Sequence, residues 1–429
     1  MRDEGAAEPL IPTTEVQPTA ASAPGPTPAA ERLEVLDVLR GLALYGVLLA
    51  NAVVWFSGRA FMARGPQSPQ LGALDRTFML LFGIFVDGKA MSLLTFLFGL
   101  GFALQLQRAE AAGRTVATTH LRRLAALTLI GVCHVLLLWW GDILWGYAIA
   151  GVGLLLFRRM KGRKVLLWAL VLVVVPHFLA TIPVIAKALR PITPAPADFD
   201  AFRAQVLAAI TGHDRRLLTQ MQVKQAYYHV GSFWLPYFPG LVGRFLFGYW
   251  AGMSKLFERT EERLPFFRKL AAWGIGLGLL GSVIVPVFRL LSFYKLVSLS
   301  ESLRMKVVVP SELGTLLLAY GYAAAVVLLL HRPVARRLLR RIAPVGQMAL
   351  TTYLMQSLIC TFLFYGWGLG LIAHVQAARV LPLTLAVFTL QVLFARAWLS
   401  RFRFGPMEWV WRSLTYGRAQ PLRLRRPYP

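Results

Sequence analysis

The run VLLWALVLVVVPHFLATIPVIA covers residues 165–186 and contains no Asp, Glu, Lys or Arg. A second charge-free run covers residues 343–378. A helix needs roughly 20 mostly apolar residues to cross a hydrocarbon core of about 30 Å, and both runs are long enough. They predict helices that span a membrane.

The composition of the whole chain indicates the same class of protein. Of the 429 residues, 57% are hydrophobic and 15% are charged, whereas a soluble domain has roughly 45 to 50% apolar and about 25% charged residues. This difference excludes a soluble protein. We predict an all-α fold, a polytopic transmembrane helix bundle.

Apolar runs separated by short charged segments predict about ten spans. The apolar segment 74–86 is too short to cross the bilayer unaided, so we expect one short re-entrant or interfacial helix there. The expected spans cover residues 36–57, 89–107, 121–140, 142–158, 164–186, 232–254, 269–290, 308–330, 346–372 and 377–396.

These spans divide the chain into five regions. Lys and Arg concentrate in alternate connections between the spans, and this bias predicts that both termini are cytoplasmic. The long connection at 187–231 has room for one or two short helices. The regions are a disordered cytoplasmic tail at 1–32, N-terminal transmembrane helices at 33–186, an extracytoplasmic loop at 187–231, C-terminal transmembrane helices at 232–400 and a basic cytoplasmic tail at 401–429.

The net charge of +26 does not predict a nucleic-acid partner. The basic residues lie mostly between apolar runs, where the insertion bias of membrane proteins explains them, and membrane lipid is the expected partner. Cys133 and Cys360 lie inside apolar segments without Cys-x-x-Cys spacing. We therefore expect no disulfide framework, no metal site and no bound cofactor.

Two polar residues of the first expected span, Arg40 and Asn51, lie about three helical turns apart. At 3.6 residues per turn they share one face, roughly 16 Å apart in height. Ionisable groups inside a bilayer usually face the bundle interior or a water-filled cavity. Two interpretations remain: Arg40 pairs with Asp37 at the interface, or Arg40 binds an anion while Asn51 forms hydrogen bonds deeper in the membrane.

His134 lies inside the third expected span, and Asp142 follows it after two tryptophans and a glycine. An imidazole has an unperturbed pKa near 6.5, which suits proton transfer, and a nearby carboxylate would fix its tautomer. The alternative is that His134 only joins helices by a hydrogen bond. Whether Asp142 reaches His134 depends on the bend at Gly141.

Four more cations are candidates for binding an anionic substrate. Lys89 follows Asp87 and Gly88, and it either pairs with Asp87 or faces a cavity. Arg244 interrupts an apolar run and is expected to pair with a buried carboxylate or an anionic ligand. Arg122 and Arg123 lie at the expected cytoplasmic end of the third span.

Several stretches resemble a known family. They are LDVLRGLALYGVLLAN at 36–51, GKAMSLLTFLFGLGFAL at 88–104, HVLLLWWGDILWGYAIAG at 134–151, and GQMALTTYLMQSLICTFLFYGWGLGL at 346–371 together with RFRFGPMEWVWRSLTYG at 401–417. Their content, order and spacing resemble the YeiB-type bacterial inner-membrane proteins, the domain of unknown function numbered 418. The resemblance implies a multi-pass protein of the bacterial inner membrane.

That family is similar to a wider group of transmembrane acyltransferases, including the heparan-alpha-glucosaminide N-acetyltransferase type and the O-acetyltransferases of cell-surface polysaccharides. The resemblance implies transfer of an acyl group from cytoplasmic acyl-CoA to a sugar. The shared element would be Arg40 and Asn51. The O-acetyltransferases have histidine where this chain has Asn51, and residues 52–88 lack the loop histidine of the glucosaminide enzymes.

The leading hypothesis is therefore acyl transfer to a sugar or another cell-envelope acceptor, with acyl-CoA as co-substrate. His134, oriented by Asp142, would be the general base, while Asn51 and Lys89 would polarise the thioester carbonyl. Arg40, with Arg122 or Arg123, would bind the phosphates. The alternatives are a transporter or flippase for a small anion or lipid-linked precursor, and a non-catalytic scaffold.

Overall fold

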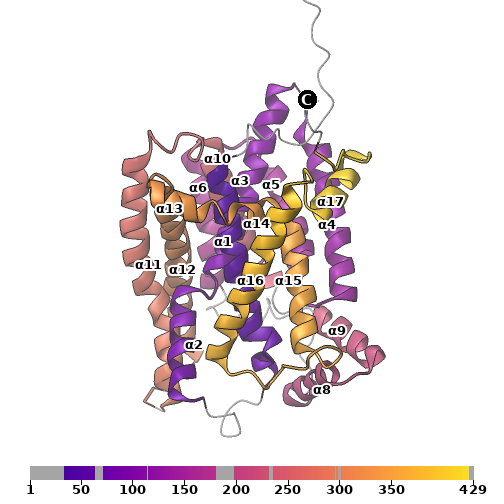
Figure 1. Ribbon diagram of the computed structural model, residues 1–429. Helices are drawn as coiled ribbons and strands as arrows, with labels where there is room; N and C mark the ends of the chain where they lie inside the picture. The colour runs from indigo at the N-terminus through magenta and orange to yellow at the C-terminus, as the bar shows by residue number, and fades with distance from the viewer. Residues whose placement is uncertain are drawn as a thin grey trace, which may run out of the picture.

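The computed structural model describes residues 33–62, 71–113, 115–179, 198–230, 235–294, 296–297 and 301–424, and within these ranges it contains helices and no strand (Figure 1). The all-α prediction is confirmed. The expected tail at 1–32 lies outside the described residues. The helices are α1 (Glu34–Asn51), α2 (Ala73–Phe85), α3 (Lys89–Ala111), α4 (Val116–Leu137), α5 (Leu144–Phe157), α6 (Arg163–Leu179), α8 (Phe199–Thr211), α9 (Arg215–His229), α10 (Leu235–Met253), α11 (Leu264–Phe293), α12 (Glu301–Leu330), α13 (Pro333–Leu339), α14 (Ala343–Gln347), α15 (Ala349–Phe364), α16 (Ala377–Leu399) and α17 (Pro406–Tyr416).

Within the described ranges, 6 helical stretches are long and apolar enough to cross a membrane. The protein is a membrane protein, but the predicted count of about ten spans is not confirmed. Two further apolar helices, α5 with 14 residues and α15 with 16, are shorter than these six stretches. The six stretches are Glu34–Phe61, Ala73–Ala111, Val116–Leu137, Leu264–Phe293, Val307–Leu330 and Ala377–Leu399.

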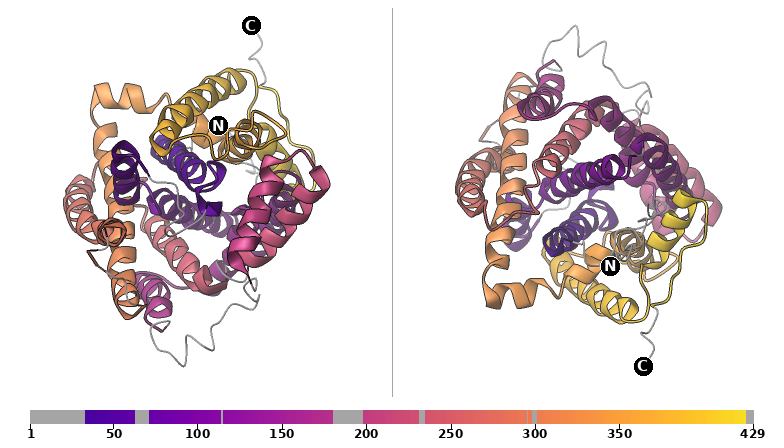
Figure 2. Two further views of the ribbon diagram at one scale, coloured as in Figure 1. Left: turned by 90° about the horizontal axis from the view of Figure 1, so that it is seen from below. Right: turned by 90° about the horizontal axis from the view of Figure 1, so that it is seen from above.

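The short apolar segment expected at 74–86 forms α2. This helix packs against α11 and α16 and stops just before a turn at Gly88, whose φ of 78° favours glycine. The next helix, α3, starts at Lys89 and runs through the middle of the bundle, where it contacts α1, α10 and α12 (Figure 2).

Glycines bring α3 and α10 into direct backbone contact. A Cβ added at Gly99 would overlap the carbonyl oxygen of Phe245, and one added at Gly248 would overlap that of Phe96. The pair α11 and α12 packs in the same way, with Gly281 against Gly314. Small residues allow such close approach in membranes, where van der Waals contact between helices replaces hydrophobic burial as the source of association.

The two ends of the bundle differ. At one end, which we call the tail face, lie the start of α1 and the short helices α13, α14 and α17; at the other, the loop face, lie α8 and α9 (Figure 1). The described part of the expected loop thus contains two helices. The described part of the expected C-terminal tail contains α17, which packs on α4 and α15.

Glu408 joins α17 to the first turn of α15. Its Oε1 accepts hydrogen bonds from the backbone N–H groups of Leu350, at 2.6 Å, and Thr351, and its Oε2 accepts one from the Thr351 hydroxyl. A carboxylate at a helix N-terminus satisfies backbone donors that lack partners within the helix. Burial raises the pKa of Glu408 above its ordinary value, and these hydrogen bonds oppose the rise.

We predict that Gly248→Ala destabilises the protein. The new methyl group would overlap the Phe96 carbonyl, and overpacking of this kind costs roughly 1 to 3 kcal/mol. The matched control is Gly276→Ala on α11, where nothing lies within 4 Å of the added carbon. Thermal unfolding in detergent, followed by size-exclusion fluorescence, should show a lower Tm for Gly248→Ala alone. Equal Tm values for the two variants would contradict the close contact.

We also predict a pH dependence of stability at Glu408. A carboxyl whose folded-state pKa is raised stabilises the fold while protonated, so the contribution is present below about pH 4.5 and lost as pH rises through the folded-state pKa. The stability and the Tm of the parent should therefore fall as pH rises through this pKa. Glu408→Gln can donate to Thr351 and stays neutral, so its Tm should not show this fall. Glu408→Ala should lower the free energy of unfolding by about 1 to 3 kcal/mol, and with it Tm, at every pH. Parallel Tm curves for parent and Glu408→Gln would refute the assignment.

Candidate functional site

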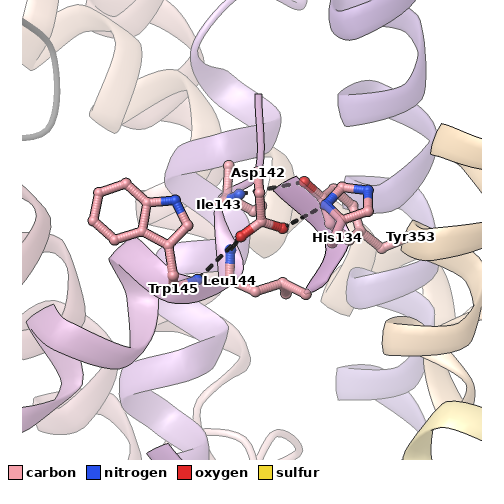
Figure 3. Close-up of polar contacts among 6 residues, drawn as sticks. All are labelled: His134, Asp142, Ile143, Leu144, Trp145 and Tyr353. Atoms are coloured by element: carbon pink, nitrogen blue, oxygen red, sulfur yellow. Dashed lines mark hydrogen bonds and ion pairs between the residues drawn. The ribbon is translucent and has the colours of Figure 1, made fainter. Parts of the chain in front are cut away.

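His134 and Asp142 form a buried hydrogen-bonded pair (Figure 3). The imidazole Nδ1 lies 2.7 Å from Asp142 Oδ2, and the two side chains are 1% and 0% exposed. The sequence could not show that Asp142 would reach this histidine, and the structure brings them together. The second carboxylate oxygen, Oδ1, accepts hydrogen bonds from the backbone N–H groups of Leu144 and Trp145.

Local backbone geometry explains why Asp142 reaches α4. This helix ends at Leu137, and the chain turns back before α5 begins at Leu144, with Asp142 fixed by the first N–H groups of α5. Gly131 lies one turn before His134 on α4, where an added Cβ would stand 2.8 Å from Asp142 Oδ1 and 2.7 Å from the Trp145 nitrogen. The absence of a side chain at Gly131 therefore makes room for the carboxylate.

The other imidazole nitrogen, Nε2, is buried, and it has no hydrogen-bond partner among the residues that the structure describes. An Nδ1–H that donates to the Asp142 carboxylate leaves Nε2 with its lone pair. The ring of Tyr353 lies beside the imidazole, with centroids 5.4 Å apart, and the Tyr353 hydroxyl accepts a hydrogen bond from the Ile143 N–H. The pair can therefore accept a proton at a defined atom.

Cations gather nearer the tail face. Arg40 pairs with Asp37 at 2.8 Å, as the interfacial interpretation expects. Arg123 lies over the Trp411 ring at 4.4 Å, and the Trp411 indole N–H donates to the Arg123 carbonyl oxygen. Arg40 and Arg412 both lie within electrostatic range of Arg123. We call Arg40, Arg123 and Arg412 the arginine cluster.

Arg122 lies outside that cluster. Its side chain is exposed, whereas that of Arg123 is partly buried. Neighbouring residues on a helix point about 100° apart, so only one of the two can face the interior. Of the two arginines proposed as alternatives, Arg123 is the one that the structure places with Arg40.

Asn51 occupies the last position of α1, immediately before a π-helical turn at Ala52–Phe56. Among the described contacts, none joins its side chain directly to His134. The next residues nevertheless reach the segment that connects α4 to α5: Trp55 meets Trp140 with ring centroids 5.0 Å apart, and Phe56 meets Trp139 at 4.7 Å. The end of α1 therefore packs against the segment that positions Asp142.

The same aromatic contacts extend to the loop face. His229, the last residue of α9, lies beside Trp140 with ring centroids 5.2 Å apart. Burial lowers the pKa of His229 to about 4, so its imidazole is neutral near pH 7. Trp140 therefore joins the segment between α4 and α5 to the end of α9 through ring contacts.

Two predicted substrate-binding cations lie elsewhere and have partners. The Lys89 ammonium donates a hydrogen bond to the Gly83 carbonyl oxygen at 2.9 Å, and not to Asp87. Arg244 on α10 forms an ion pair with Glu312 on α12, a carboxylate that is partly exposed. No described contact joins Lys89 or Arg244 to His134.

Sequence reasoning did not single out Tyr353, Gly131 or Trp411 as site residues. Tyr353 lies far from His134 in the chain, and only the packing of α15 brings them together. A glycine in an apolar helix has many roles, so Gly131 gave no specific signal. Within the described ranges, no group of three or more His, Cys, Asp or Glu residues could hold a metal ion, and Cys133 and Cys360 are free thiols.

Comparison with known proteins gives a consistent assignment. The family model described as "Protein of unknown function (DUF418)" matches residues 251–418. The chain is 32% identical to the uncharacterized protein YxaH of Bacillus subtilis in an alignment 416 residues long, which covers 92% of this chain and 97% of that protein. It is 29% identical to the uncharacterized protein YeiB of Escherichia coli, over 91% of this chain and 98% of that protein.

These matches extend over nearly the whole length of each relative, so they include the first four helices as well as the segment matched by the family model. The stretches that resemble the family in sequence contain Arg40, His134 and Asp142. The chain belongs to the YeiB-like DUF418 family of membrane proteins.

Proposed function

We propose that the protein is a transmembrane acyltransferase that uses acyl-CoA as co-substrate. An acceptor hydroxyl or amine attacks the thioester carbonyl, a C–O or C–N bond forms and the C–S bond breaks. The proton of the acceptor passes to His134 Nε2 and then to the CoA thiolate. The products are an acylated sugar or other cell-envelope acceptor and free CoA.

The observation that supports this proposal most strongly is the His134–Asp142 pair. Asp142 holds the imidazole through Nδ1, and Nε2 is the nitrogen that has no described partner. A histidine held in one tautomer by a carboxylate is the usual arrangement for a general base in acyl transfer. His120, which is also buried, likewise leaves Nδ1 without a described partner, but its Nε2 contacts the Gly151 carbonyl oxygen and not a carboxylate.

The position of the arginine cluster also supports acyl-CoA. Arg123 and His134 lie on one helix about three turns apart, and so do Arg40 and Asn51 on α1, which corresponds to roughly 16 Å in each case. Arginine binds phosphate through paired hydrogen bonds. In this proposal Arg40 and Arg123 bind the CoA phosphates, and the thioester arm extends along both helices toward His134.

Asn51 is proposed to hydrogen-bond the thioester carbonyl. It lies at the same height along α1 as His134 along α4 when both are counted from their arginines. Lys89 was predicted to share this role, but its ammonium already donates to Gly83, so Asn51 is the better candidate. The tail face is then cytoplasmic, where acyl-CoA is made, and the acceptor enters from the loop face.

A transporter is the second candidate, and one observation favours it. Arg244 and Glu312 form an ion pair between two helices of the bundle, with side chains 12% and 20% exposed. Charged groups within membrane segments often mark ion or substrate pathways. Transport predicts counterflow of a labelled anion in proteoliposomes without consumption of acyl-CoA.

We predict that His134→Gln abolishes acyl transfer. Loss of a general base should lower kcat by about 10² to 10⁴, because no other group would take the acceptor proton. Purified protein, radiolabelled acetyl-CoA and a panel of candidate sugars measure both label transfer and free CoA. Arg40→Ala should instead raise KM for acetyl-CoA. The histidine control is His331→Gln, since His331 is exposed in the turn before α13.

The outcomes separate the hypotheses. If His134→Gln and the parent transfer label equally, the proposed site is wrong. If the parent neither binds nor consumes any acyl-CoA, the protein is not an acyltransferase. Counterflow in that second case, lost in Glu312→Gln, would establish transport.

A further inference from the structure

A groove opens on the side of the bundle near the end of α4 that follows His134. It lies between α4, α9 and α15, has a volume of about 300 Å³, and combines apolar and polar lining. A volume of this size is at the lower limit of pockets that bind small organic molecules. Its lining includes Leu137, Leu358 and Trp367 on the apolar side, and Arg215, Gln222 and Thr361 on the polar side.

Two helices of the groove also hold His134 and the Tyr353 ring beside it. Leu138 lines the groove, and its N–H donates to the His134 carbonyl oxygen at 2.9 Å, one helical turn away. On α15, Leu358 follows Tyr353 by just over one turn, and the Tyr353 ring lies against His134. The groove therefore lies about one turn beyond His134, on the side of the loop face.

The groove is open toward the hydrocarbon. Leu137 is 78% exposed on α4, which is long and apolar enough to cross a membrane, and Leu358 is 49% exposed on the shorter apolar helix α15. Exposed leucines on a membrane-spanning helix contact lipid chains, so a molecule in the groove can extend into the bilayer. A water-soluble sugar has no apolar part that could cover Leu137 and Leu358, so these side chains favour a lipid as the bound molecule.

The polar side of the groove has a positive charge. Arg215 is exposed at the start of α9, while Asp214 beside it accepts hydrogen bonds from the backbone N–H groups of Arg216 and Leu217. Gln222 donates to the Leu138 carbonyl oxygen and fixes α9 against α4. An arginine at the edge of an apolar groove suits an amphiphile whose headgroup contains phosphate.

We propose that this groove binds a membrane lipid of net negative charge whose headgroup contains phosphate and a free hydroxyl, and that this hydroxyl is the acyl acceptor. The lipid chains lie along Leu137 and Leu358, the phosphate contacts Arg215, and the headgroup extends toward His134. The acceptor role rests on the proposed acyltransferase function. The same chemistry is found in a glycerophospholipid and in a polyprenyl-phosphate-linked sugar, which the experiment distinguishes.

Lipid binding is tested without reference to catalysis. The full chain is placed in nanodiscs of neutral phosphatidylcholine, and the Kd of radiolabelled phosphatidylglycerol and of a polyprenyl-diphosphate-linked monosaccharide is measured. Arg215→Glu and Leu137→Trp should weaken binding of the correct lipid roughly tenfold, because they reverse the charge and fill the groove. The matched controls are Arg216→Glu, the exposed neighbour, and Leu167→Trp, a leucine 61% exposed on α6.

Equal effects of the groove and control substitutions, or equal binding of phosphatidylcholine, would overturn the proposal. The second measurement follows label from acyl-CoA into the lipid fraction, which we expect to depend on Arg215. Label only in soluble sugar, unaffected by Arg215→Glu, overturns the lipid acceptor and leaves the acyltransferase intact. Arg215-dependent lipid binding without any release of CoA overturns the acyltransferase and with it the acceptor role.

Discussion

The inability of hydrocarbon to solvate polar groups determines how this protein is built. A polar side chain placed inside the bundle needs a partner from the protein itself, since an unsatisfied one costs several kcal/mol. Arg40 has Asp37, Lys89 has the Gly83 carbonyl, and Arg244 has Glu312. Nine buried side-chain atoms among the described residues lack a hydrogen-bond partner, and Nε2 of His134 is the one on an imidazole whose other nitrogen binds a carboxylate.

Much of the fold follows from that same constraint and could be predicted. Runs without charge identify helices, and the approximate bounds of α1, α3 and α16 agree with the expected spans. The number of spans could not be predicted in the same way. Helices such as α5 and α15 are apolar but short, and hydropathy alone does not tell whether a short apolar helix crosses the membrane.

The candidate site was predictable in its residue types and not in its geometry. The sequence has a histidine inside an apolar span, where a polar group is energetically costly, and an aspartate soon after it. Only the turn after α4 decides that the two side chains meet. The choice between Arg122 and Arg123 depended on helix rotation, which the sequence leaves open. Tyr353 reaches His134 through the packing of α15, a contact between residues far apart in the chain that periodicity cannot indicate.

The backbone contact between α3 and α10 has a consequence for how the bundle can move. With carbonyl groups of each helix seated against glycines of the other, neither helix can slide along its partner without collision. A rearrangement of the bundle that keeps these contacts therefore has to move α3 and α10 as a pair, and the same holds for α11 and α12, where Gly281 lies against Gly314.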